Sequence, residues 1–281
     1  MNIDNLLQEG SSILKEKNIQ TYKIDSELIL SKTIKKDLSF ILANGDFEIH
    51  PREIKIYKDL ILRRKKNEPI AYILKRKEFW SIDFNLNKNV LIPRPETEFI
   101  VEEVIKKYRH KNPINILDIG TGSGCILLSL LKNLENSKGI GIDKSKKAIK
   151  IAKKNSCFLK LQTRSKFINS DIDNFRSGTY DVIVSNPPYI CSHGIKYLSR
   201  DIRDYEPIEA LDGGFDGMKT TISIVKKSQK LLKKGGHLYI EIGEKQFIKL
   251  SNILLKNNFR IVKRVYDYRQ NLRCIISTKA T

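Results

Sequence analysis

Residues 114–124 read Ile-Asn-Ile-Leu-Asp-Ile-Gly-Thr-Gly-Ser-Gly. The apolar run is typical of a buried strand, and the glycines permit the positive φ and the close backbone approach that a strand-to-helix turn requires. Asp143 closes the next predicted strand, at a position where a carboxylate can accept both hydroxyls of a ribose. The stretch therefore predicts a nucleoside-containing cofactor across the carboxyl ends of parallel strands. A tight strand–helix turn without a ligand is the alternative.

The spacing of these glycines is G-x-G-x-G, whereas dinucleotide-binding folds use G-x-G-x-x-G. A cofactor without a pyrophosphate suits the loop better than NAD does. S-adenosylmethionine is such a cofactor, and its methionine part can lie along the turn made by Gly120, Thr121, Gly122, Ser123 and Gly124. Asp118, at the end of the strand, either faces the ammonium group of the cofactor or only caps the turn. The sequence leaves both readings open.

Helices and strands alternate on both sides of this stretch. Such alternation predicts an α/β fold in which helices cover both faces of a doubly wound parallel sheet. A tail with two apolar segments adds a predicted terminal hairpin. The predicted helices cover residues 96–108, 123 onward, 148–154 and 220–232, and the predicted strands cover residues 114–119, 139–142, 167–168, 182–184, 237–242, 259–265 and 272–277.

The chain before residue 96 has a different pattern. Residues 1–75 predict a small helical domain of three or four helices, with Asp25 as a candidate helix cap and Pro51 at a helix start. Residues 76–95 predict a β-hairpin linker, because apolar residues partly alternate and are interrupted at 87–89. We therefore expect three parts: domain 1–75, linker 76–95 and sheet domain 96–281.

The composition is that of a globular chain. It has 281 residues, of which 40% are hydrophobic and 30% charged, and its 52 Lys and Arg against 32 Asp and Glu give a net charge of +20. Such charge is typical of proteins that contact nucleic acid or a ribonucleoprotein. The lysines are nevertheless spread along predicted helices, so charge alone leaves a polyanionic partner open.

Neither a secretory signal nor a membrane segment is predicted, and the four cysteines lack C-x-x-C spacing. We expect free thiols in a cytoplasmic protein. His193 lies two residues after Cys191, but no third ligand is in view, so no metal site is predicted.

The most informative residues are Ser185-Asn186-Pro187-Pro188-Tyr189, directly after the strand at 182–184. Two prolines fix this loop and remove two N–H donors, so the carbonyls of Asn186 and Pro187 are free to face a ligand. Asn186 adds a side-chain oxygen, and Tyr189 adds an aromatic face. This set suits a planar NH2 group, whose two hydrogens meet two acceptors while its nitrogen is aligned for methyl transfer. An ordinary proline turn is the alternative, and Glu241 at a strand end is a candidate supporting residue.

The glycine loop together with Asn186–Tyr189 resembles class I S-adenosylmethionine methyltransferases that act on amide or exocyclic amino nitrogens. Three further stretches resemble the release-factor glutamine methyltransferases, the HemK/PrmC family. They are residues 68–74 with 78–80, residues 91–98 with their Pro93-Arg94-Pro95-Glu96-Thr97 segment, and residues 201–214 with Tyr205-Glu206-Pro207.

The resemblance implies methyl transfer from S-adenosylmethionine to the glutamine of a Gly-Gly-Gln loop in peptide-chain release factors, with no membrane partner and no direct nucleic-acid substrate. It implies cofactor contacts along Gly120–Gly124, ribose at Asp143, and adenine beside Asp171 and Ile172. Asn186, Pro187, Pro188 and Tyr189 would bind the substrate glutamine. Of these, Asn186, Pro187 and Tyr189 are the expected catalytic residues, and Asn186 is also expected to contact the cofactor.

Two positions depart from the family pattern. Lys75 stands where the family usually has glycine, and Ile172 where an aromatic residue often stacks on adenine. The rival hypotheses are an adenine-N6 methyltransferase acting on a flipped base and a non-catalytic ribosome-binding protein.

Overall fold

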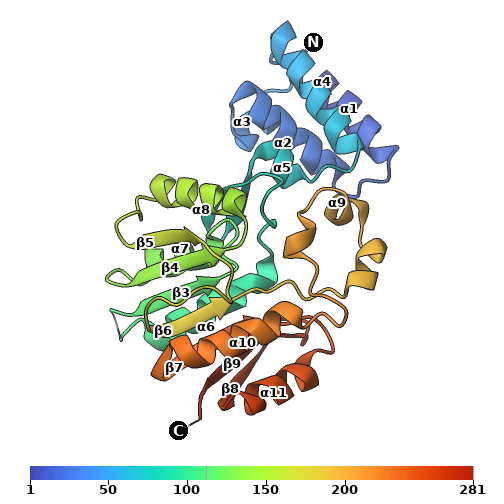
Figure 1. Ribbon diagram of the computed structural model, residues 1–281. Coiled ribbons are helices and arrows are strands. Elements are labelled where there is room, and N and C mark those ends of the chain that lie inside the picture. The colour runs from blue at the N-terminus through green and yellow to red at the C-terminus, as the bar shows by residue number, and fades with distance from the viewer. Residues whose placement is uncertain (112, 281) are drawn as a thin grey trace. The chain divides into compact units, whose positions relative to one another are not determined.

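The computed structural model describes residues 1–111 and 113–280 (Figure 1). Its chain forms two compact units. The first comprises residues 1–76 together with Ser199–Tyr205, and the second comprises the rest of the described chain. Within the described ranges, no helix is both long and apolar enough to cross a bilayer.

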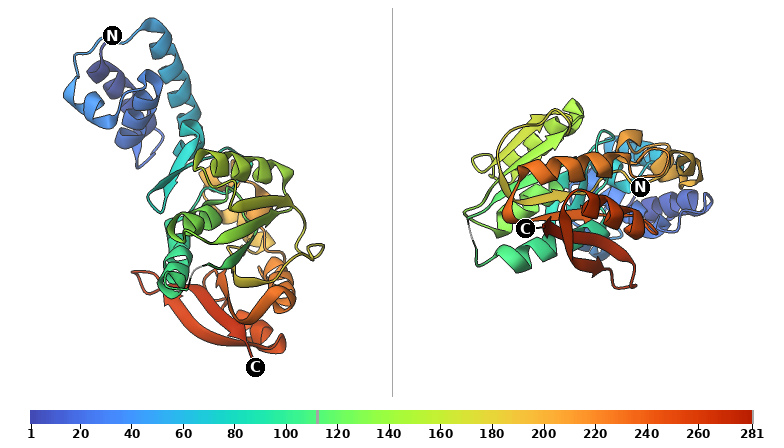
Figure 2. Two further views of the ribbon diagram at one scale, coloured as in Figure 1. Left: turned by 90° about the vertical axis from the view of Figure 1, so that its left-hand side faces the viewer. Right: turned by 60° about the horizontal axis from the view of Figure 1, so that its bottom comes forward.

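The first unit is helical, as the sequence predicts. Two of its helices, α3 and α5, have only six and five residues, which is too short for periodicity to reveal. Figure 2 shows that the blue part of the chain is built of helices. The helices of residues 1–75 are α1 (Ile3–Lys15), α2 (Tyr22–Ile34), α3 (Leu38–Ala43), α4 (Pro51–Lys65) and α5 (Ile70–Leu74), and α9 (Arg200–Arg203) lies in the returning segment.

Polar contacts inside this unit fix the helices on one another. The Tyr57 hydroxyl lies 2.6 Å from the Ser26 hydroxyl and donates to the carbonyl of Leu6 at 3.0 Å. A side chain at Gly10 would collide with that hydroxyl, so α1 can approach α4 only with glycine at this position. The later segment joins the unit as well, because the Tyr205 hydroxyl donates to the carbonyl of Lys66 at 2.8 Å.

Asp25 does not cap a helix, so that prediction was wrong. Helix α2 begins three residues earlier, at Tyr22, and Asp25 is buried in its first turn. Its carboxylate accepts from the Thr21 hydroxyl and from Nε of Arg64, each at 2.7 Å. The buried ion pair with Arg64 therefore links α2 to the end of α4.

Lys75 closes α5 in the left-handed conformation, with φ of 60°. Its N–H donates to carbonyls of the preceding turn, as a glycine in a helix-terminating turn would. The departure from the family pattern thus preserves the turn at this point.

The predicted hairpin is present, but its turn was predicted in the wrong place. Strands β1 (Arg76–Phe79) and β2 (Ile82–Asn85) are joined at Trp80 and Ser81, whose φ values are 54° and 52°. Two positive φ values match the tight turn that suits the twist of a hairpin. Residues 87–90 do form a turn, closed by the Val90 N–H donating to the Asn87 carbonyl at 3.2 Å, but the strand expected at 90–92 does not form.

The second unit contains a seven-stranded sheet of order β5-β4-β3-β6-β7-β9-β8, which confirms the predicted doubly wound sheet. The first five strands in this order are parallel, and β9 and β8 add the predicted antiparallel hairpin. The chain order reverses between β3 and β6, where open α/β sheets bind their ligands. The strands are β3 (Asn115–Ile119), β4 (Lys138–Asp143), β5 (Ser165–Asn169), β6 (Tyr180–Ser185), β7 (Leu232–Glu241), β8 (Phe259–Tyr266) and β9 (Leu272–Lys279).

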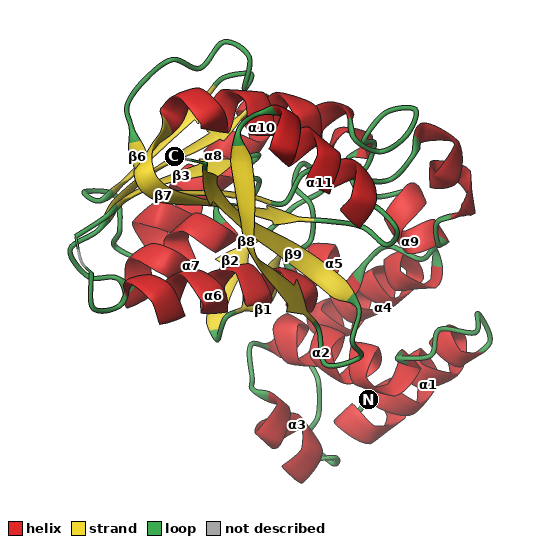
Figure 3. Ribbon diagram, turned by 90° about the horizontal axis from the view of Figure 1, so that it is seen from below, coloured by secondary structure: helices red, strands yellow, loops and turns green. Residues whose placement is uncertain are grey.

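Helices cover both faces of this sheet (Figure 3). Helices α6 (Glu98–Tyr108), α7 (Cys125–Asn133) and α8 (Lys146–Phe158) share one apolar cluster with Val182 and Val184 of β6. Helices α10 (Lys219–Leu231) and α11 (Phe247–Lys256) share the other with Ile183. Burial on both faces explains why β6 reads as a continuous apolar run. The 3-10 helices are η1 (Pro95–Thr97), η2 (Ser192–Tyr197) and η3 (Ile208–Ala210).

Asn155 on α8 connects the hairpin to the glycine loop. Its Oδ1 accepts from the backbone N–H and the side-chain amide of Asn85, at 2.8 and 3.0 Å. Its Nδ2 donates to the carbonyls of Asn85 and Ser123, at 3.1 and 2.9 Å. Asn155 is fully buried and Ser123 is 2% exposed, so the bond between them is closed to water, whereas Asn85 is half-buried.

We expect Asn155→Ala to lower the free energy of unfolding by about 2–3 kcal/mol, because it leaves buried backbone groups unpaired. Urea unfolding at constant slope measures this loss. Asn136→Ala is the matched control, since Asn136 is exposed and its loss changes stability by no more than about 0.5 kcal/mol. Equal losses in the two variants would contradict the role given to Asn155.

Candidate functional site

The predicted site residues lie in the loops that leave β3, β4, β5 and β6. Because these strands are parallel, their carboxyl ends share one edge of the sheet. Ile119 is in register with both Ile142 of β4 and Ser185 of β6, so the glycine loop is flanked by the two other loops. The Ser185 hydroxyl donates to the carbonyl of Ile119 at 2.7 Å and fixes the two central strand ends together.

The glycine loop is open on its outer side. Gly120, Gly122 and Gly124 have φ values of 74°, 54° and 83°, all in the region that favours glycine. A Cβ at Gly120 would meet no atom within 4 Å, whereas one at Gly124 would contact Leu128 at 3.1 Å. The first glycine therefore leaves room for a ligand, and the last allows α7 to pack closely.

Asp118 supports the loop from below with one of its two oxygens. Oδ2 accepts from the Thr121 hydroxyl at 2.6 Å, so the carboxylate does cap the turn. Oδ1 is buried and has no hydrogen-bond partner among the described residues. Burial raises the pKa of Asp118 to about 7. The unpartnered oxygen is available to a donor from a bound group.

Asp143 organises the loop before any ligand arrives. Its Oδ2 accepts from the Gly122 N–H at 2.9 Å, and its Oδ1 accepts from the Ser145 N–H at 2.8 Å. Burial raises the pKa of Asp143, and these two hydrogen bonds oppose that rise. A carboxylate offers about four acceptor positions, so both oxygens can still accept from hydroxyls.

The two candidate residues in the loop after β5 lie in different surroundings. Asp171 is exposed, and its Oδ1 accepts from the N–H of Asp173 at 2.9 Å. Ile172 is half-buried against the apolar cluster of the α10 and α11 face. Lys227 of α10 fixes the loop by donating from Nζ to the carbonyls of Asp173 and Phe175, at 2.9 Å each.

Asn186 is held from behind by residues far away in the sequence. Its Nδ2 donates to the Thr97 hydroxyl at 3.0 Å, and that hydroxyl donates to Oε2 of Glu241 at 2.7 Å. Outside the strand ladders, no backbone N–H of the described residues donates to the carbonyl of Asn186 or Pro187. The carbonyl oxygens of the loop are therefore open to a donor, while the NH2 group of Asn186 is held toward Thr97.

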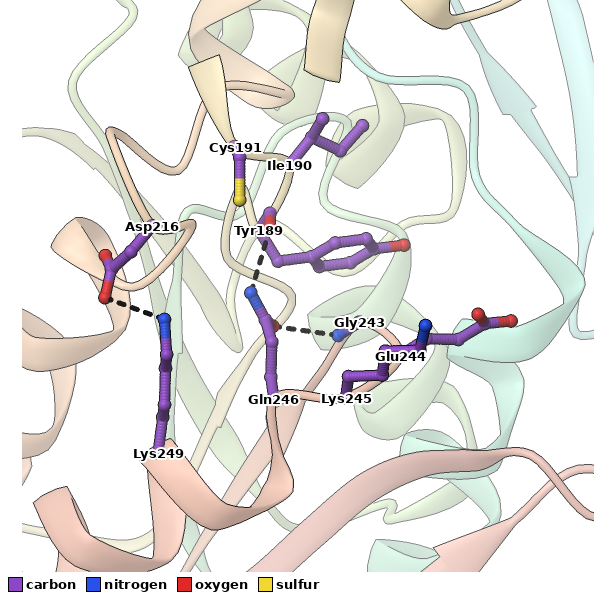
Figure 4. Close-up of a pocket in the computed structure, with 9 residues that line it drawn as sticks. All are labelled: Tyr189, Ile190, Cys191, Asp216, Gly243, Glu244, Lys245, Gln246 and Lys249. Atoms are coloured by element: carbon purple, nitrogen blue, oxygen red, sulfur yellow. Dashed lines mark hydrogen bonds and ion pairs between the residues drawn. The ribbon is translucent and has the colours of Figure 1, made fainter. Parts of the chain in front are cut away.

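Tyr189 lines a pocket of about 330 Å³ together with residues of the segment that follows β7. Figure 4 shows its ring below Ile190 and above Gln246 and Lys249. Gln246 donates from Nε2 to the Tyr189 carbonyl at 3.0 Å and accepts from the Gly243 N–H at 3.0 Å. Burial raises the pKa of Tyr189 to about 12, so its hydroxyl stays protonated at neutral pH.

Sequence reasoning missed three supporting residues: Thr97, Arg94 and Glu206. Arg94 forms an ion pair with the buried carboxylate of Glu206, which also accepts from the Ile92 N–H at 3.1 Å. All three lie in stretches that carry the family resemblance, and that resemblance was the only feature of the sequence that could have pointed to them. Their pairing depends on contacts across about a hundred residues, which a single sequence does not reveal.

Comparisons with known proteins show the family and the fold of the chain. Residues 5–74 match the family described as PrmC N-terminal domain, and residues 110–273 match the family described as methyltransferase domain. A solved methyltransferase from Pyrococcus furiosus shares the fold, with a TM-score of 0.54 and 19% identity over 80% of this chain and 98% of its own.

Curated relatives match the whole chain. A release factor glutamine methyltransferase from Clostridium acetobutylicum is 39% identical over 99% of both chains. One from Clostridium botulinum is 40% identical over 99% of this chain and 100% of its own. Identity at this level over the full length identifies the chain as a member of the release factor glutamine methyltransferase family.

Proposed function

We propose that this enzyme transfers a methyl group from S-adenosylmethionine to the side-chain amide nitrogen, N5, of the glutamine in the Gly-Gly-Gln motif of peptide-chain release factors, and so modulates translation termination. The observation that carries the proposal is the loop Asn186–Tyr189, which presents acceptor oxygens at the sheet edge next to the glycine loop. The names of the full-length relatives favour a protein glutamine over a flipped base as the acceptor.

The residues around the glycine loop fit the cofactor. The open face of Gly120 gives room for its methionine part, and the unpartnered Oδ1 of Asp118 suits a donor such as an ammonium group. Asp143 would accept from the ribose hydroxyls, and Asp171 and Ile172 would flank the adenine, with Ile172 giving an aliphatic contact in place of aromatic stacking. When bound, the cofactor supplies an electrophilic methyl group on a sulfonium.

The chain's own residues would align the substrate nitrogen. Oδ1 of Asn186 and the Pro187 carbonyl accept the two amide hydrogens, and the Tyr189 ring packs against the flat amide. Held this way, the nitrogen lone pair is turned out of conjugation and toward the methyl carbon, which is catalysis by orientation. No side chain has to take a proton before transfer, because the amide proton can leave to water afterward.

The helical segment 1–75 would recognise the release factor, with residues 76–95 as the linker to the methyltransferase domain at 96–281. An amide pocket alone cannot select one glutamine among the many in cellular proteins. The helical segment has its own core and contributes none of the residues proposed to hold the cofactor. Its recognition of the factor would provide binding energy remote from the reacting nitrogen.

Mass spectrometry of a purified release factor tests the proposed reaction. After incubation with enzyme and S-adenosylmethionine, the Gly-Gly-Gln peptide is expected to gain roughly 14 Da, since one methyl replaces one hydrogen. A factor whose target glutamine is replaced by alanine is the control. Methylation elsewhere in the factor, or of nucleic acid instead, would refute the assignment.

Asp143→Ala and Asn186→Ala are expected to separate cofactor binding from methyl transfer. Asp143→Ala is expected to weaken the binding of S-adenosylmethionine by roughly 1.5–3 kcal/mol, as measured by calorimetry, because charge-assisted hydrogen bonds are lost. The second leaves that affinity largely unchanged and lowers kcat by roughly 100-fold or more, because the amide loses its alignment. Each variant is the control for the other. Equal loss of affinity in both would place Asn186 mainly at the cofactor.

The role of the helical segment predicts a strong preference for the folded factor. We expect kcat/KM for the intact release factor to exceed that for a short Gly-Gly-Gln peptide by about 100-fold or more, because the peptide lacks the remote contacts. Steady-state kinetics with the full-length enzyme measure this ratio. Equal values for the two substrates would leave the helical segment a structural role only.

A further inference from the structure

A hydrogen-bonded chain of three polar side chains, the half-buried Asn186 and the buried Thr97 and Glu241, lies behind the proposed substrate amide. Asn186 follows β6, Glu241 ends the neighbouring β7, and Thr97 closes η1. Thr97 and Glu241 are 2% and 3% exposed, so water does not compete for their hydrogen bonds. The chain runs from Nδ2 of Asn186 to the Thr97 hydroxyl and from there to Oε2 of Glu241.

The chemistry of this chain decides which way the Asn186 amide faces. An ionised Glu241 can only accept, so the single hydroxyl proton of Thr97 is committed to it. The Thr97 oxygen is then left as an acceptor and draws in the NH2 end of Asn186. Oδ1 consequently faces outward, which is the end that a substrate N–H requires.

We propose that Thr97 and Glu241 are positioning residues that select the productive orientation of the Asn186 amide, and that protonation of Glu241 reverses it. The inference rests on the proposed function of Asn186. A protonated Glu241 donates to Thr97, the Thr97 hydroxyl donates onward to Oδ1 of Asn186, and the amide turns its NH2 end to the substrate. Two N–H groups then oppose each other, and the substrate amide loses its acceptor.

The surroundings of Glu241 place its titration near neutral pH. Burial raises its pKa to about 7, helped by the charge of Glu96, while Arg273, the hydrogen bond from Thr97 and the nearby NH2 end of Asn186 oppose the rise. Cys274 of β9 is its register partner, and Tyr189 also lies within electrostatic range. Both of these groups stay neutral around pH 7 because burial raises their pKa values. The carboxylate that supports the productive orientation is therefore present above pH 7 and is lost as the pH falls through 7.

The first test is the pH dependence of kcat. It is measured at saturating S-adenosylmethionine, so that a change in cofactor affinity on titration of Asp118 does not affect the rate. Wild-type kcat is expected to fall about tenfold between pH 8 and pH 6, as one group with a pKa of about 7 is protonated. Glu241→Gln has an oxygen that still accepts from Thr97 but no proton to titrate, so its profile is expected to be flat. An unchanged acid limb in Glu241→Gln would overturn the proposal.

Thr97 gives an independent set of variants. Thr97→Val has the same shape without the hydroxyl, and we expect kcat at pH 8 to fall about tenfold with the KM for S-adenosylmethionine unchanged. Thr97→Ser is expected to restore most of the rate. Thr278→Val is the matched control, because it removes a buried hydroxyl that donates to the Gly236 carbonyl, away from this edge of the sheet. Equal rates in Thr97→Val and the wild type would refute the positioning role.

A readout without catalysis separates this inference from the proposed function. In 15N-labelled protein, the side-chain NH2 signals of Asn186 are assigned by their absence in Asn186→Asp. We expect them to shift with a midpoint near pH 7 in the wild type and to stay constant in Glu241→Gln. Wild-type protein that shows this shift but does not methylate release factor would refute the function and keep the orientation mechanism. Signals that do not titrate in wild-type protein would refute the mechanism whatever the activity.

Discussion

The register between β3 and β6 is the constraint on which the site depends. Ile119 lies opposite Ser185, and the hydroxyl of Ser185 donates to the carbonyl of Ile119 at the point where both strands end. A parallel ladder whose two faces are buried cannot slip by one residue, since every side chain would change face. The glycine loop and the loop of Asn186 therefore begin at the same height. Two reactants bound to these loops, as proposed, would be brought together by the sheet itself.

The sequence was sufficient to predict the sheet and the location of the loops, because each depends on local signals. Continuous apolar runs marked the parallel strands, and glycines and prolines marked their ends. The hairpin turn was misplaced because Trp80, which is not a usual turn residue, adopts positive φ together with Ser81. Asp25 looked like a helix cap, but its partner Arg64 lies 39 residues away. What failed were the features that only tertiary contacts decide.

The same distinction holds inside the candidate site. Asn186 was found because two prolines follow it, whereas Thr97 gave no sign that it would lie behind Asn186 from 89 residues away. The structure also accounts for part of the large positive charge. Arg64, Arg94 and Lys227 serve buried carboxylates or carbonyls within their own units. These cations stabilise the fold and are not free to bind a polyanion, which weakens an argument from net charge alone.

The helical unit contains residues from two distant parts of the chain, namely 1–76 and Ser199–Tyr205. During synthesis on the ribosome, the first part emerges well before the second. The bond from Tyr205 to the Lys66 carbonyl spans 139 residues and cannot form until four of the five parallel strands, β3 to β6, have been made. Since domains generally fold as units from the N-terminus during synthesis, the helices are expected to assemble early and to be completed late. The last contacts of the helical unit therefore form only after most of the parallel strands have been synthesised.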